Sequence, residues 1–504
     1  MRRRSRPQPR PAGARPSLQR YLFYAALVVL SLVLPAALTL VGRHPPPSSQ
    51  QADGDPPGDV MWTTVPGGGG MPVDEPVSPL IWQGMAQGIP STPRSANDIH
   101  VVFSTDCSPY QNYQAIMLFN SAEVVEQGAV TRVASGCSDE EQMELQEVMD
   151  KQPERFRVHF TPDFSIDPET GEQFLFYNKP NGMAHFLKNA DPPVSEAVIA
   201  LIDPDMILMS ALTPNVGNPG RMLWHREEFA RGPQFIVEGH PVGQFYGLGG
   251  VWADWKDLPE ITEALGQDTP ARQVSTAEAA SVYPVGPPYM MHPRDWARLL
   301  DLWVGLSAKV YKRHPSILAE MYGFCIAAAH LRLRHRVAYG LMVSDANMPT
   351  SEGWPMVDRL GANACDASAV ANLGEYIPSV VHYCQLYRVG TYMFGKRHKS
   401  HHQFFTCSAD ALELPPPDYL MSPMATVRVH PKRKNPQGKD SMTEEKVSVQ
   451  TGVRQGYAMC AVLRAMNAAQ LSYKNRYCRP EDITGGVRKF TDLSPAQLAT
   501  DGFA

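Results

Sequence analysis

Two aspartates one residue apart stand between two apolar runs in the stretch ALIDPDMILM, residues 200–209. The run before Asp203 has the length and composition of a buried strand, so both carboxylates are expected where that strand ends. Pro204 disfavours a helical backbone at Asp203, and in an extended chain side chains two positions apart point the same way. Neighbouring carboxylates repel each other unless a cation lies between them, and Mg²⁺ and Mn²⁺ prefer oxygen ligands. Asp203 and Asp205 are therefore candidate metal ligands, although Asp-Pro-Asp also favours a simple turn.

Alternating strands and helices are expected to position this pair. Short apolar runs that stop at polar or turn residues predict strands near 99–107, 129–136, 156–163 and 195–209, and segments with helical spacing lie between them. In the second of these helices, Ser138 and Glu141 have the spacing of a capping box. The pattern predicts an α/β domain with a mainly parallel sheet, in which ligands bind at the carboxyl ends of strands.

Composition limits the classes of function. The chain has 504 residues, 43 % of them apolar, and a formal net charge of −5. This balance can fill a large core, and it lacks the basic field that nucleic-acid binding requires, so no nucleic-acid partner is expected.

The N-terminus predicts a membrane anchor. Residues 1–20 contain seven arginines and no acidic residue, and the 22 residues of 21–42 carry no charge. A run of this length can cross a bilayer as a helix, and the arginines should stay in the cytosol, which gives a single-pass type II protein with the rest of the chain in the lumen. A cleaved signal peptide is the alternative, but the apolar run is longer than is typical of one.

A segment rich in proline and glycine separates the expected anchor from the compact domain. Residues 43–98 are too rich in these residues to pack a core, and they predict a disordered stem. The compact domain is expected over 99–420, followed by a C-terminal extension, 421–504, that contains a helix.

Eight cysteines, all beyond residue 100, allow disulfides in a lumenal domain. No CxxC pair occurs, so a structural zinc site is not expected. Pairing cannot be read from sequence, and the nearest neighbours suggest Cys107 with Cys137 and Cys460 with Cys478.

Taken in order, several motifs resemble those of the plant and algal cell-wall glycosyltransferases that comprise the hydroxyproline O-arabinosyltransferases and the peptidyl serine α-galactosyltransferases. The motifs are HVVFSTDCSPYQNYQ (100–114), TRVASG (131–136), YNKPNGMAHFL (177–187), LIDPDMIL (201–208), PVGPPYMMHPRD (284–295), LAEMYGFCIAAAHLRLRH (318–335), VVHYCQLY (380–387) and LPPP (414–417). The resemblance implies a GT-A-like, Rossmann-like fold with a mainly parallel sheet flanked by helices. It also implies a UDP-sugar donor, Mn²⁺ or Mg²⁺, and a Golgi membrane location.

The resemblance assigns metal and catalytic roles by position. His382, in VVHY, resembles a third metal ligand beside Asp203 and Asp205, and neutral imidazole can ligate Mn²⁺. Lys179 would pair with the diphosphate. Glu320 lies among apolar residues, where a carboxylate is costly unless it is used or paired. It would orient a sugar or shield positive charge at the anomeric carbon, or else form a structural ion pair with Arg332 or Arg334.

The resemblance also points to cofactor-binding residues: Thr105 and Asp106 for uridine, and Asn178 with Lys179 for the diphosphate. Each has an ordinary structural alternative, such as a loop cap for Asp106 or a solvated surface lysine for Lys179. The HKSHH run, residues 398–402, is expected to be a surface segment.

The two branches of the family differ in donor and acceptor. DPDM and LPPP favour transfer of arabinose to hydroxyproline, whereas FSTDC and EMYGFCIAAAHLRLRH favour transfer of galactose to serine. Either acceptor would be a secreted glycoprotein rich in hydroxyproline or serine. A catalytically inactive, membrane-tethered binding protein of the same fold is the alternative from another class. A metal-dependent hydrolase is disfavoured because the 15 histidines do not group at ligand spacing.

Overall fold

The computed structural model describes residues 82–488 with short gaps at 168–170, 172, 256, 349–350, 390–391, 417–419, 421–426, 430–432, 435–439, 442–443 and 447. The chain divides into the units Met1–Gly68 and Gly69–Ala504, and all described residues belong to the second. The predicted tail 1–20, the anchor 21–42 and the stem up to residue 81 lie outside the described residues. Within the described part, no helix has the length and hydropathy needed to span a bilayer.

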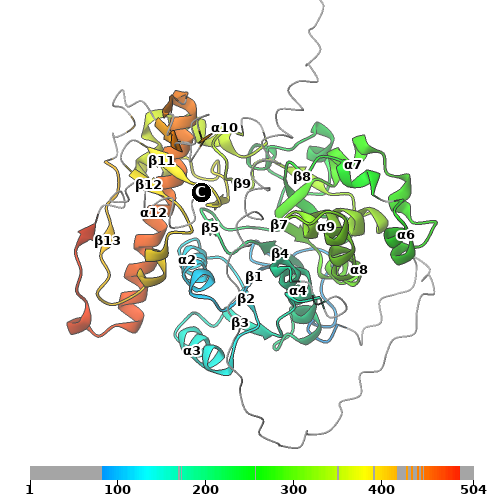
Figure 1. Ribbon diagram of the computed structural model, residues 1–504, viewed down its shortest axis with the longest axis horizontal. Coiled ribbons are helices and arrows are strands. Elements are labelled where there is room, and N and C mark those ends of the chain that lie inside the picture. Colours follow the sequence, from blue (N-terminus) through cyan, green and yellow to red (C-terminus); the bar gives the residue numbers. More distant parts are fainter. Residues whose placement is uncertain are drawn as a thin grey trace, which may run out of the picture. The chain divides into compact units, whose positions relative to one another are not determined.

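A seven-stranded sheet forms the centre of the described domain, in the order β3-β2-β1-β4-β7-β6-β8 (Figure 1). Only β7 runs antiparallel to its neighbours in this sheet. The predicted α/β domain with a mainly parallel sheet flanked by helices is confirmed. The strands are β1 Ile99–Thr105, β2 Val130–Ser135, β3 Phe156–Thr161, β4 Val198–Ile202, β6 Val242–Phe245, β7 Val285–Met291 and β8 Arg336–Ala338.

Both faces of this sheet are covered by helices, and alternate side chains of a strand point to opposite faces. On β1, Val102 packs with the helices α4, α8 and α9, whereas Val101 and Phe103 pack with α2 on the opposite face (Figure 1). This period of two is what a strand covered on both sides requires. The covering helices are α2 Pro109–Val124, α4 Asn178–Asn189, α8 Pro293–Arg313 and α9 Ala319–His330.

Local signals fix several helix starts. Ser108 caps α2, and Pro109 occupies its first turn, where the missing N–H costs nothing. Ser138 and Glu141 form the predicted capping box of α3, Asp139–Met149. The helix α4 begins at Asn178 and has no side-chain cap.

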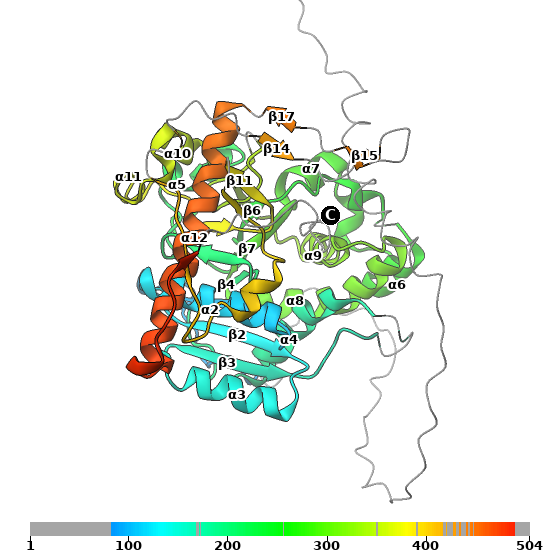
Figure 2. The same ribbon diagram turned by 60° about the vertical axis from the view of Figure 1, so that its left-hand side comes forward.

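A second, three-stranded sheet extends the site region. It consists of β5 Met206–Leu208, β9 Met342–Val343 and β10 Val380–His382, with β10 in the middle. Ile207 and Val381 from this sheet share a core with Tyr457 and Leu463 of the long helix α12, Val449–Tyr477 (Figure 2). The C-terminal helix is therefore part of the domain core.

Smaller elements complete the described part. The helices are α5 Pro219–Met222, α6 Pro259–Leu265, α7 Thr276–Val282, α10 Trp354–Val357 and α11 Ala367–Ala371. The paired strands are β11 Tyr387–Val389 with β12 Tyr392–Phe394, β13 Ala411–Leu412 with β18 Val487–Arg488, β14 Val427–Val429 with β17 Glu444–Lys446, and β15 Arg433–Lys434 with β16 Asp440–Ser441.

The compact domain extends further than the sequence boundaries suggest. Trp82 is buried, and within the predicted stem the amide of Gly84 donates to Lys188 O at 3.0 Å, as that of Ala86 does to Val194 O at 2.8 Å. The residues from Trp82 onward therefore pack on the domain, although proline and glycine are frequent there. At the other end, the boundary at residue 420 separates α12 from the core to which it belongs.

The disulfides confirm one expected pair and correct the other. Cys107 is bonded to Cys137, as predicted. Cys460 and Cys478 do not pair: the chain between them is helical, so they lie about 27 Å apart along its axis. A disulfide needs Cα atoms within about 7 Å. Cys460 is bonded instead to Cys365, and Cys478 to Cys407.

Candidate active site

The Asp-Pro-Asp segment is a turn and also brings two carboxylates into one site. It connects β4 to β5, and β5 pairs with β10 so that Met206 lies opposite His382. The amide of Tyr383 donates to Asp205 O at 3.0 Å, which holds the turn against the end of β10. The carboxylates thus converge because the chain turns here, and not through the extended spacing that the sequence suggested.

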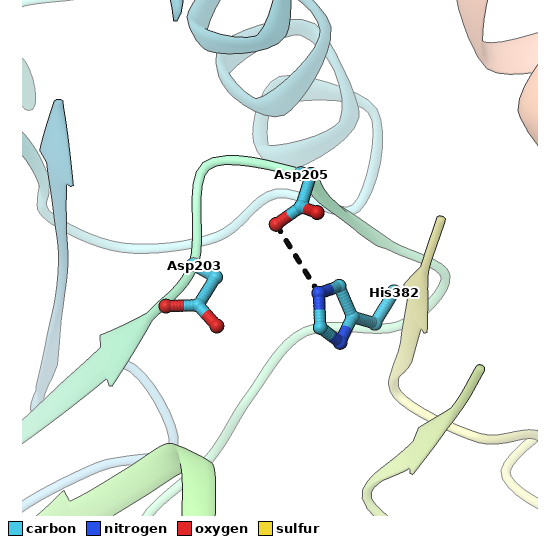
Figure 3. A group of neighbouring side chains, drawn as sticks. All are labelled: Asp203, Asp205 and His382. Carbon is cyan, nitrogen blue, oxygen red and sulfur yellow. Dashed lines mark ion pairs between the residues drawn. The ribbon is translucent and has the colours of Figure 1, made fainter. Parts of the chain in front are cut away.

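Asp203, Asp205 and His382 each offer one ligand atom within 4.8 Å of the others (Figure 3). His382 Nε2 lies 3.2 Å from Asp205 Oδ1. Asp205 and His382 are buried, and the Asp203 side chain is 19 % exposed, so the group opens to solvent on its Asp203 side. Two carboxylate oxygens and one imidazole nitrogen are a donor set that suits Mn²⁺.

Basic groups compensate the buried charge of Asp205. Lys396 donates to Asp205 Oδ2. Burial alone would raise the pKa of Asp205, but the charges of His382 and Lys396 and their hydrogen bonds hold it well below its usual range. Burial lowers the pKa of His382, yet the charges of Cys384 and Asp205 outweigh it and raise that pKa well above its usual value. Without a metal the site therefore favours a protonated imidazole, and a cation would displace that proton.

Lys179 connects the first turns of α4 and α9 to the same site. Its Nζ lies 2.9 Å from Asp203 Oδ1 and 2.8 Å from Glu320 Oε1. Burial lowers the pKa of Lys179, but Asp203 and Glu320 raise it above its usual value, so the ammonium stays charged. Glu320 is thus paired with Lys179, whereas its expected structural partner Arg334 pairs with Glu278.

One oxygen of Glu320 is left without a partner among the described residues. Glu320 is 1 % exposed, and its Oε2 makes no hydrogen bond there. Burial raises the pKa of Glu320, against the lowering effect of Lys179. An unpaired buried carboxylate oxygen is costly, and in this position it is available to a hydroxyl group.

Thr105 and Asp106 are held by a neighbouring network. Arg132 of β2 donates to Thr105 Oγ1 at 2.8 Å, to Asp106 O at 2.8 Å and to Asn112 Oδ1 at 2.6 Å. The Asp106 carboxylate accepts from Ser108 N at 2.9 Å, which is the loop-cap arrangement. The structure therefore ties both residues to the end of β1 but does not bring them into the Asp203 group.

Asn178 holds a loop next to the site. Its Oδ1 accepts from Phe164 N at 2.7 Å, and its Nδ2 lies 3.3 Å from Asp163 Oδ1. The side chain is thus directed to residues 163–165, and only Lys179 of this pair contacts the carboxylates.

Two further residues belong to the site. Lys396 stands two residues before the HKSHH run, 398–402, and Tyr113 donates to Lys396 O. The surface position predicted for that run is wrong at His401, which is fully buried. No local pattern identifies this lysine. Tyr246 Oη lies 3.3 Å from His382 Nδ1.

The arrangement fits a divalent cation and a polyphosphate. Asp203, Asp205 and His382 would hold the cation, which would neutralise phosphate charge. Lys179 and Lys396, which pair with Asp203 and Asp205, supply two ammonium groups for phosphate oxygens.

Comparison with known proteins identifies relatives. No family model matches the chain. A peptidyl serine alpha-galactosyltransferase of Arabidopsis thaliana is 24 % identical over 279 residues, which are 52 % of this chain and 30 % of the relative. Its namesake in Chlamydomonas reinhardtii is 23 % identical over 407 residues, which are 78 % of this chain and 48 % of the relative.

The chain is related to the plant and algal peptidyl serine α-galactosyltransferases. The resemblance that the ordered motifs indicate is thereby confirmed. The chain covers less than half of either galactosyltransferase's own length. Their names describe proteins that contain more than the region shared with this chain.

Solved structures of glycosyltransferases are also similar to this chain. The bifunctional glycosyltransferase WbbM is 11 % identical, with a TM-score of 0.30, and the match covers 58 % of this chain and 47 % of WbbM. The galactosyltransferase LgtC, in complex with donor and acceptor sugar analogues, is 12 % identical with the same TM-score, over 57 % of this chain and 87 % of LgtC. A TM-score of 0.30 is too low to support an argument about the fold, so the fold is described from the strand order given above.

Proposed function

We propose that this protein is a GT-A-like glycosyltransferase that transfers a sugar from a UDP-sugar to a hydroxyl group of a polypeptide. The single observation that carries the proposal is the convergence of Asp203, Asp205 and His382 at the end of β4, with Lys179 and Lys396 against the carboxylates. This set supplies what a sugar diphosphate requires: oxygen and nitrogen ligands for a cation, and ammonium groups for the phosphates.

The roles of the residues follow from where charge develops. When the bond between sugar and phosphate breaks, negative charge grows on the diphosphate and positive charge on the anomeric carbon. Lys179 and Lys396 would stabilise the first, together with the cation. Glu320, whose Oε2 has no partner among the described residues, would hold a sugar hydroxyl or face the anomeric carbon. Thr105 and Asp106 would form the uridine side of the site.

For donor and acceptor we propose galactose and serine. This choice is supported by the names of the two curated relatives and by FSTDC and EMYGFCIAAAHLRLRH in this sequence. Transfer of arabinose to hydroxyproline is the second candidate, because DPDM and LPPP favour that branch of the family. In both cases the proposed acceptor is a secreted glycoprotein rich in hydroxyproline or serine.

For location we propose the Golgi membrane, with the domain in the lumen behind the charge-free segment 21–42. Disulfides at Cys107–Cys137, Cys365–Cys460 and Cys407–Cys478 support an oxidising compartment, because such bonds are rare in the cytosol. Protection of a C-terminal tag from protease in intact microsomes is the expected result, and a cytosolic tag would contradict the topology.

The function is tested with the purified full chain, a panel of UDP-sugars and two peptides, one rich in serine and one rich in hydroxyproline. We expect transfer of galactose to the serine peptide, with activity lost in EDTA and restored by Mn²⁺. Transfer of arabinose to the hydroxyproline peptide would favour the second candidate. A protein that binds UDP and Mn²⁺ but turns over no donor would be the inactive binding protein.

A further inference from the structure

We propose that the protein has a second small-molecule site, behind β5, which binds an apolar body carrying one carboxylate or similar oxygen group. This inference does not depend on the proposed glycosyltransferase activity. It rests on a cavity of about 390 Å³ that is lined by residues of α2, α11, α12 and β5. Figure 2 shows the three helices.

The cavity exists because small side chains face one another across it. Alanines line the walls on α11 and α12, and Ile207, Leu208 and Met209 form the floor. The wall alanines are Ala364, Ala367, Ala371, Ala461, Ala465 and Ala468. Methyl groups cannot fill the space between helices, so these elements leave a pocket that is partly open to solvent. Its volume is more than twice the roughly 150 Å³ of an engineered cavity that binds benzene.

A buried hydroxyl in the wall has no partner. Tyr457 is 1 % exposed, lines the cavity, and its Oη makes no hydrogen bond to any residue that the structure describes. Burial raises the pKa of Tyr457, so the hydroxyl keeps its proton and remains a donor. An unmet buried donor costs about 1–3 kcal/mol. A ligand oxygen at this point would remove that cost.

A guanidinium stands beside this hydroxyl. Arg464 lies about two helical turns beyond Tyr457 on α12, lines the same cavity, and donates to Cys365 O. The carboxylate near it, Asp366, accepts from Ser368 N and Ala369 N as the cap of α11. Arg464 and Asp366 attract each other but form no ion pair within ion-pair distance among the described residues, so the guanidinium can donate to an anion in the cavity.

Two further polar side chains line the wall, Asn120 and Ser121, both on α2. Ser121 Oγ is satisfied, because it donates to Leu118 O at 2.8 Å and accepts from Leu208 N at 3.0 Å. Tyr457 and Arg464 lie together on α12, and apart from these four side chains the lining is apolar. This is the pattern of a pocket that recognises an apolar molecule by one polar end.

The probe is 2-naphthoate, titrated calorimetrically into the full chain, with the uncharged 2-naphthamide as its matched analogue. We expect both to bind and the carboxylate to bind more tightly. Tyr457→Phe should weaken both by about two- to tenfold, the value of one hydrogen bond. Arg464→Gln should remove the preference for the carboxylate.

Ala461→Phe fills the cavity and should abolish binding of both probes, and Ala465→Leu serves if that variant does not fold. Leu471→Phe, on the exposed side of α12, is the control and should bind as the wild type does. Absence of binding by the wild-type chain, or equal binding by the wild type and the filled variants, would overturn the proposal.

Discussion

Lys396 and Asp205, 191 positions apart in the sequence, form an ion pair at the centre of the candidate active site. The pair means that the carboxylate is already compensated when no cation is bound. A metal ion must therefore compete with an ammonium group for Asp205, and the released lysine becomes available to a phosphate.

Replacing Lys396 should separate metal binding from donor binding. In Lys396→Met the competing ammonium is gone, so Mn²⁺ alone should bind more tightly, by about tenfold if the ion pair is worth one pKa unit. UDP in saturating Mn²⁺ should bind more weakly, because a phosphate partner is lost. Calorimetric titrations of both ligands give the two affinities. Arg397→Met, at the exposed neighbouring position, is the control and should leave both affinities unchanged. If the affinities of Lys396→Met for Mn²⁺ and for UDP changed in the same direction, the assignment of Lys396 to both roles would be contradicted.

Asp205→Asn keeps the shape of the side chain and removes its charge. We expect Mn²⁺ to lose most of its stabilising effect on thermal unfolding, and transfer to fall by at least about two orders of magnitude, the usual cost of removing one strong electrostatic contribution. Asp268→Asn, an exposed site away from the triad, should behave like the wild type. An Asn variant with full activity and unchanged response to Mn²⁺ would leave Asp205 as a turn residue only.

Tyr246→Phe removes the hydroxyl next to His382 Nδ1 without changing the ring. Groups that orient a ligand histidine typically contribute 10–100-fold in metal affinity or activity. The Mn²⁺ concentration for half-maximal effect should therefore rise by about tenfold, while the free energy of unfolding in EDTA changes little. The matched control is Tyr311→Phe, away from His382, and equal Mn²⁺ dependence of both variants would remove Tyr246 from the site.

The salt bridge between Lys179 and Glu320 can be tested by stability alone. Lys179→Met leaves Glu320 buried and unpaired, which should cost about 3–5 kcal/mol in denaturant unfolding. The double variant Lys179→Met, Glu320→Met should recover most of this loss, because both charges are gone. A double variant as unstable as the single one would show that the lysine acts through Asp203 instead.

Sequence reasoning found the parts of this fold whose signals are local. The first strands and the capping box at Ser138 both depend on a few adjacent residues. The position of α12 in the core could not be found in this way. Its contacts with β5 and β10 join segments about 250 and 70 residues apart, and a proline- and lysine-rich stretch precedes it.

The candidate site shows the same limit. Asp203 and Asp205 stand out because two carboxylates between apolar runs are unusual, and His382 follows from the family resemblance. Lys396 and Tyr246 reach the site only through pairing of distant strands, and nothing in their own neighbourhood identifies them. The partner of Glu320 was missed because Arg332 and Arg334, which follow the end of α9, are closer in sequence than Lys179.

Acid should destabilise the protein in part through His159. His159 Nε2 lies 2.9 Å from His185 Nδ1. Burial, together with the charges of His185 and Arg157, lowers the pKa of His159 to about 4. In the unfolded state the imidazole of His159 has a pKa of about 6.5, so it is protonated there first as the pH falls. Its contribution to stability is therefore fully present above about pH 6.5 and is lost toward pH 4. In His159→Gln the loss of melting temperature between about pH 6.5 and 4 should be smaller. An identical pH profile for both proteins would exclude this contribution.

The packing of α12 against β5 and β10 has a consequence for how the protein is made. Asp205 leaves the ribosome about 250 residues before the helix that covers the apolar side of its strand. Until α12 has been synthesised and Cys460 has met Cys365, Ile207 and Val381 lack their covering residues. The half of the domain that carries Asp203, Asp205 and His382 must therefore wait for nearly the whole chain, and a nascent chain stalled near residue 420 should be a client of chaperones rather than a smaller folded domain.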